Sequence, residues 1–131
     1  MGIINNKYYI KNPTITKLKK MGFRYDFISS TVDDKCYSYE FPVDDYNGHH
    51  TLMCTFRTYM DNGETIIDLR NADGSVFSGW YQYDDLIYNY LKDYLKCIEN
   101  KIRNEINKLG IVESKNVNVI VNSEKWRKNN E

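Results

Sequence analysis

Two adjacent histidines are the residues with the most obvious capacity to bind a metal. His49 and His50 close the polar segment DDYNGHH (residues 44–50), which begins with two aspartates. Imidazole nitrogens and carboxylate oxygens are ligands for transition metals, but adjacent side chains seldom point to one centre and no second ligand pair has a suitable spacing. We interpret the segment as a solvated loop and expect no metal site.

The cysteines show no pattern that indicates nucleophilic catalysis. The chain has an odd number of cysteines, and Cys36, Cys54 and Cys97 are widely spaced and form no CxxC arrangement. They lie in apolar or strand-like contexts, where a thiol is usually inert. The sequence also contains no GxSxG, P-loop, GxGxxG or HExxH motif. We therefore expect a protein that is not an enzyme, with no catalytic residues and no cofactor.

Arginines, carboxylates and tyrosines alternate with apolar residues along several predicted strands, so they should share one sheet face. Such a face can recognise a polar partner through bidentate arginine contacts and aromatic stacking. It can equally be an ordinary solvated face with cross-strand ion pairs. Depending on the register, either Asp68 with Arg70 or Thr65 with Ile67 should join it. The candidate binding residues are Arg24, Asp26, Glu40, Arg57, Tyr59 and Arg70.

The strands that must position these residues are predicted from the alternation of apolar and polar residues, which has a period of two. The dipeptide Asn62-Gly63 accepts positive φ at both turn positions, so it predicts a tight hairpin between two of the strands. Short turns between the segments imply antiparallel neighbours in sequence order. The predicted strands are residues 7–11, 23–27, 36–43, 52–57, 64–70 and 75–80, with a further short strand within 111–121.

Two helices are predicted around this meander. A short one follows Pro13, with Ile15, Leu18 and Met21 at helical spacing and Gly22 as its C-cap. A long amphipathic helix begins at Asp84 or Asp85 and ends before Gly110. Its apolar stripe comprises Ile87, Leu91, Leu95, Ile98, Ile102, Ile106 and Leu109. The fold class predicted is α+β: an antiparallel β-meander of four to six strands with the long helix packed on one face.

Chain length, net charge and hydropathy limit the possible domain organisation, partners and location of the protein. The 131 residues suit one domain, which we place at 1–121, and the polar residues 122–131 should form a fraying tail. Eighteen basic and eighteen acidic residues cancel, unlike the basic footprint of a general nucleic-acid binder. The N-terminal segment lacks an apolar stretch of signal-peptide length, and no segment approaches the roughly eighteen apolar residues of a membrane span. We expect a cytoplasmic protein that does not bind a membrane.

Several segments together resemble small uncharacterised proteins of phages and prophages from low-GC Gram-positive bacteria. They are KLKKMGFRYD, YSYEFPVDDYNG, CTFRTYMDNGETIIDLRNADG and INKLGIVE, which span roughly residues 15 to 113. The resemblance implies an accessory factor that antagonises a host enzyme or defence system by stoichiometric binding. It assigns no role to any residue.

Three functional hypotheses follow. The first is an inhibitor of a host defence system, similar to an anti-CRISPR protein, that binds a host protein or protein–nucleic-acid complex through the sheet face or the 44–50 loop. The second is a sponge that sequesters a nucleotide immune signal, with Arg24, Arg57 and Arg70 at a homodimer interface. The third is nucleic-acid binding by the meander, which the zero net charge disfavours.

Overall fold

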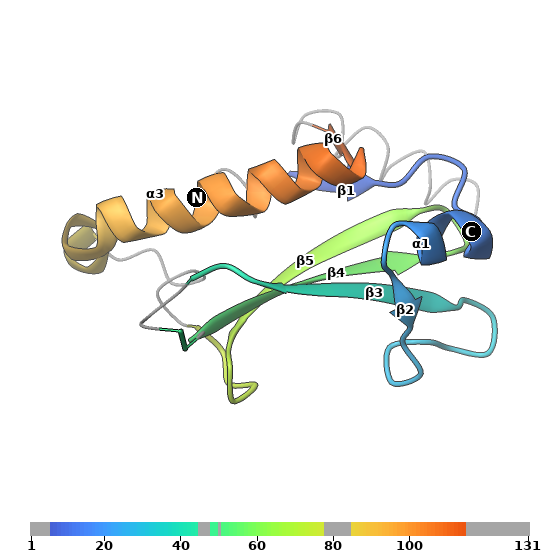
Figure 1. The fold of residues 1–131 in the computed structure, drawn as a ribbon, viewed down its shortest axis with the longest axis horizontal. Coiled ribbons are helices and arrows are strands. Elements are labelled where there is room, and N and C mark those ends of the chain that lie inside the picture. Colours follow the sequence, from blue (N-terminus) through green and yellow to red (C-terminus); the bar gives the residue numbers. More distant parts are fainter. Residues whose placement is uncertain (1–5, 45–47, 50, 78–84, 115–131) are drawn as a thin grey trace, which may run out of the picture.

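The computed structural model describes residues 6–44, 48–49, 51–77 and 85–114, and these form an α+β fold (Figure 1). The predicted fold class is confirmed: one antiparallel sheet of six strands, a short N-terminal helix and a long C-terminal helix lie within the described residues. The strands are β1 (Lys7–Tyr9), β2 (Arg24–Tyr25), β3 (Cys36–Pro42), β4 (Leu52–Tyr59), β5 (Glu64–Asn71) and β6 (Val112–Ser114), and the helices are α1 (Ile15–Lys20) and α3 (Asp85–Leu109).

The strand order is β2-β3-β4-β5-β1-β6, so the sheet is a meander only from β2 to β5. The N-terminal strand β1 lies between β5 and the C-terminal strand β6, and this placement corrects the expectation that all neighbours follow sequence order. Within the described residues, some of the predicted strands are also shorter than expected. The segment 23–27 contributes Arg24–Tyr25 alone, and the described part of 75–80 makes one isolated bridge, between Val76 and Arg70.

The hairpin at Asn62-Gly63 explains how β1 reaches the sheet. Gly63 has φ +78°, a conformation that favours glycine, and an added Cβ there would lie 2.2 Å from the carbonyl oxygen of Ile10. The Ile10 amide donates a hydrogen bond of 2.9 Å to the Gly63 carbonyl. The glycine therefore permits the turn and also the close approach of the chain after β1.

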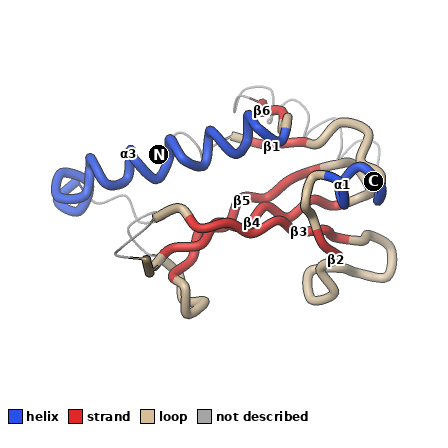
Figure 2. The backbone as a smooth tube through the Cα atoms, viewed as in Figure 1, coloured by secondary structure: helices blue, strands red, loops and turns tan. Residues whose placement is uncertain are grey.

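The long helix α3 lies along one face of the sheet (Figure 2). Its described apolar side chains Leu95, Ile98, Ile102 and Ile106 are buried in the same cluster as the inward residues of β3, β4 and β5. The inward row on β4 is Leu52, Cys54, Phe56 and Thr58, which alternates with partly exposed residues as the period of two requires. The described part of the stripe, from Leu95 onward, and the sheet face together make the core, as predicted, whereas the side chains of Ile87 and Leu91 lie outside the described part.

Polar contacts fix the helix at both sides of this core. The Tyr39 hydroxyl donates to Glu105 at 2.9 Å, and Arg103 pairs with Glu113 of β6 at 2.9 Å. At α1, Thr14 is the N-cap and its side chain accepts a hydrogen bond of 3.1 Å from the Lys17 amide. The first contact joins α3 to β3, the second joins α3 to β6, and the third caps α1 itself.

Some expectations concern other parts of the chain. The predicted strand region 117–121 and the polar tail lie outside the described residues. Among the described residues, no helix combines the length and the apolarity that a membrane crossing requires.

Candidate binding face

The face of the sheet opposite α3 carries the residues predicted to bind a partner, and we call it the outer face. Directly paired residues of antiparallel strands share a face, so the pairs Thr55 with Asp68 and Met53 with Arg70 settle the register that the sequence left open. Asp68 and Arg70 lie outward, whereas Thr65 is buried on the α3 side. The central outer-face residues are Ser38, Glu40, Met53, Thr55, Arg57, Tyr59, Ile66, Asp68 and Arg70.

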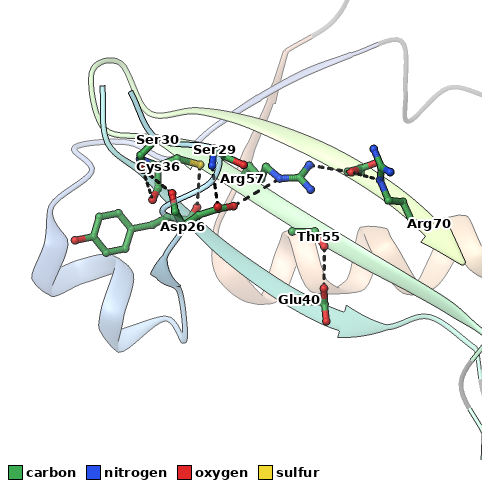
Figure 3. A network of polar contacts seen from close by, with 10 residues as sticks. Asp26, Ser29, Ser30, Cys36, Glu40, Thr55, Arg57 and Arg70 are labelled. Carbon is green, nitrogen blue, oxygen red and sulfur yellow. Dashed lines mark hydrogen bonds and ion pairs between the residues drawn. The ribbon is translucent and has the colours of Figure 1, made fainter. Parts of the chain in front are cut away.

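An ion-pair network crosses this face from the end of β2 to β5 (Figure 3). Arg57 donates through Nη1 to Asp68 Oδ2 at 2.9 Å, and its Nε lies 3.7 Å from Asp26 Oδ2. The same Asp68 oxygen is 2.9 Å from Arg70 Nε. Arg57 and both carboxylates are half-buried, so these pairs are screened less by water and salt than fully exposed pairs would be.

Asp26 joins this network to the loop between β2 and β3. Its Oδ1 accepts a hydrogen bond of 3.0 Å from the Ser29 amide, and its main-chain oxygen accepts one of 2.6 Å from the Ser30 hydroxyl. Ser30 Oγ in turn accepts from the Cys36 amide at 2.8 Å. One aspartate therefore fixes both the loop and the Arg57 guanidinium.

The other predicted site residues lie on the same face but outside the network. Glu40 is exposed, and its Oε2 accepts a hydrogen bond of 3.4 Å from the Thr55 hydroxyl. Tyr59 lies opposite Cys36, and burial raises the pKa of its hydroxyl. Arg24 pairs with Ser38 through the backbone of β2 and β3, whereas its exposed side chain forms no hydrogen bond or ion pair with another described residue.

Charge is balanced over this face. Three of the four cations at outward strand positions form an ion pair with a carboxylate of this face, and Arg24 is the exception among the described residues. The Lys7–Glu64 pair, at 3.8 Å, extends the pattern to β1. The cations are Lys7, Arg24, Arg57 and Arg70, and the anions are Asp26, Glu40, Glu64 and Asp68.

The loop between β2 and β3 was not predicted as a site. The predicted strand 23–27 would place Phe27 on the same face as Phe23 and Tyr25, but this is wrong because β2 ends at Tyr25. The chain turns at Asp26, whose carbonyl accepts a hydrogen bond of 3.1 Å from the Ser30 amide, and Phe27 points into solvent. No sequence signal available here distinguishes this turn from a continued strand.

The segment 44–50, with its aspartates and histidines, lies only partly within the described residues. No group of three His, Cys, Asp or Glu side chains that could hold a metal ion is found there. Asp44 is instead buried, and its carboxylate accepts hydrogen bonds from the amides of Thr51 and Leu52 at 3.0 and 2.9 Å. Asp45 and His50 lie outside the described residues.

Comparison with known proteins identified no relative of this chain. A scan against family models, a search of curated proteins and a search of solved structures each found no match.

Proposed function

We propose that the chain is a non-enzymatic protein that binds another protein stoichiometrically through its outer face. The network Asp26–Arg57–Asp68–Arg70 is the observation that carries this proposal. It holds charged groups in fixed positions across β4 and β5, next to the exposed side chain of Ile66. Fixed polar groups around apolar contact area are typical of protein interfaces, since little side-chain freedom is lost on binding.

The pairing of the arginines favours a protein partner over a nucleotide. Arg57 is already occupied by two carboxylates and Arg70 by one, so a phosphate would have to displace them. The balanced charge of the outer face likewise offers no basic surface for a nucleic-acid backbone. These contacts support the inhibitor hypothesis more than the nucleotide sponge or the nucleic-acid-binding domain.

The cellular role we propose follows from the resemblance to small phage and prophage proteins. We propose that the partner is a protein, or the protein part of a protein–nucleic-acid complex, in a bacterial host defence system, and that binding blocks its action. Such a protein acts in the host cytoplasm. Blocking by occupancy requires a rigid surface and no catalytic group, and the outer face offers the rigid surface.

A matched pair of triple variants tests this proposal. Glu40→Ala, Ile66→Ala and Arg70→Ala together remove an acid, an isoleucine and a base from the outer face. The control removes the same residue types elsewhere, through Asp93→Ala and Lys101→Ala on α3 and Ile15→Ala on α1. Ile66 and Ile15 are similarly exposed, at 46% and 48%, so each variant loses one isoleucine of comparable exposure.

Both variants and the wild type are used to capture partners from a bacterial lysate, with recovery quantified by mass spectrometry. We expect the control to recover one protein at the wild-type level and the outer-face variant to recover about tenfold less or lower, with unchanged circular dichroism. Equal recovery by both variants would refute the proposal. A rise in melting temperature with a cyclic or linear nucleotide would support the sponge instead.

A further inference from the structure

The loop between β2 and β3 (residues 26–35, the β2–β3 loop) exposes three large apolar side chains. Phe27, Ile28 and Val32 are 80%, 94% and 93% exposed, more than any other large hydrophobic residue that the structure describes. Single exposed apolar residues are ordinary, but a group of three in one short loop is typical of an interaction site. None of the three contributes to the core cluster, so stability does not account for them.

Hydrogen bonds hold the backbone of this loop. Asp26, Ser30 and Cys36 are linked at its base, as described above, and the outer half is closed by two bonds between Thr31 and Asp34, at 2.9 and 3.0 Å. Asp34 Oδ1 also accepts a hydrogen bond of 3.0 Å from the amide of Asp61, beyond β4. The loop is therefore fixed before any partner binds, which lowers the entropic cost of an interface.

The position of the loop makes it part of the same surface as the outer face. It projects from the sheet on the side opposite α3 (Figure 1). Asp26 connects it directly to Arg57 in the ion-pair network (Figure 3). One partner can therefore contact the loop and the network together.

The charges around the apolar residues indicate the chemistry of that partner. Asp33 and Asp61 are exposed and Asp34 is half-buried, whereas the one cation of the loop, Lys35, lies 6.0 Å from the ring centroid of Tyr25. An acidic border attracts lysine and arginine and repels an anionic membrane. A twofold contact between two copies of the loop would bring like charges together.

We infer that the β2–β3 loop is the apolar anchor of the interface, and that the partner is a protein surface of apolar residues bordered by lysine or arginine. This inference rests on the proposed function, because it names the residues that anchor the same surface. Buried apolar residues near the centre of an interface dominate the affinity, and Phe27, Ile28 and Val32 are the ones available here.

A peptide selection with matched variants tests the inference. A display library of random peptides is selected on the immobilised full-length wild-type chain, and the enriched peptides are titrated against two single variants. Ile28→Ser changes the loop, and Ile15→Ser makes the same change on α1. Both isoleucines are exposed, and Ile15 belongs neither to the loop nor to the outer face.

We expect enriched peptides that combine apolar residues with lysine or arginine, that bind the loop variant about tenfold or more weakly, and that bind the control like the wild type. Several results would overturn the inference. They are no enrichment, acidic enriched peptides, equal binding to both variants, self-association of the wild type that the loop variant loses, or loop-dependent binding to vesicles of anionic phospholipid.

The triple variant of the outer face separates this inference from the proposed function. Peptides that lose affinity for the triple variant but bind the loop variant normally would leave the outer face as the binding surface and remove the loop as its anchor. Peptides with the reverse behaviour would support the loop and contradict the role of the outer face.

Discussion

Replacement of Ile98 by aspartate should prevent folding, because this residue lies at the contact between α3 and the sheet. Its side chain is 1% exposed and belongs to the main core cluster. Burial of an isoleucine is worth about 1.5–3 kcal/mol, and a carboxyl group without a partner costs several kcal/mol more in an apolar site. The sum is comparable with the roughly 5–15 kcal/mol that stabilises a domain of this kind.

Truncation of the Ile98 side chain to alanine should cause a smaller loss of stability that can be measured. We expect Ile98→Ala to lower the free energy of unfolding by about 2–5 kcal/mol in urea denaturation, whereas Lys96→Ala, on the exposed side of α3, should change it by less than about 0.5 kcal/mol. Circular dichroism and size-exclusion chromatography report folding of Ile98→Asp. A folded, monomeric Ile98→Asp protein would refute the assignment of the α3 stripe to the core.

Three further predictions concern the turn, the network and a buried thiol. Gly63→Ala should lower the melting temperature more than Gly74→Ala, because both glycines have positive φ but an added Cβ meets the Ile10 carbonyl at Gly63 alone; equal losses would contradict this account. Arg57→Ala should lower the free energy of unfolding by about 1–2 kcal/mol in urea, since half-buried Asp26 loses its cation and Asp68 keeps Arg70 alone, and no change would show that the Arg57 pairs add nothing to stability. Burial raises the pKa of the Cys36 thiol from 9.0 to about 11, so the folded state keeps the proton that the unfolded state loses first. The stability of the wild type should therefore fall more steeply than that of Cys36→Ala between pH 9 and 11, and parallel pH profiles would contradict the shift.

Local patterns were sufficient to predict most of the fold. The stripe through Ile98 repeats with the period of a helix, and the residues on either side of Asn62-Gly63 repeat with the period of a strand, so both elements follow from short-range sequence. The place of β1 does not, because Tyr8 pairs with Thr65 and Glu113, which are remote in sequence. Short strands carry too little pattern to specify such distant partners.

The sequence was sufficient to assign the candidate site residues to one face of the sheet, but not to predict the contacts between them. Alternation along β3 and β4 was enough to put Glu40, Arg57 and Tyr59 on the side away from the helix. Which charges pair depends on the register of β5 and on the turn after β2, and neither is encoded locally. The contacts of Arg57 with Asp26 and Asp68, and the exposure of the β2–β3 loop, therefore required the structure.

Side-chain footprinting of the captured complex tests the proposed interface most directly. The chain is oxidised by hydroxyl radicals alone and bound to its partner, and the change at each side chain is read by mass spectrometry. We predict that Met53 and Tyr59, which lie on the outer face, become protected, while Met21 after α1 and Tyr94 on α3 react as before. Protection of Met21 and Tyr94 with no change at Met53 and Tyr59 would contradict the central claim that this protein binds through its outer face.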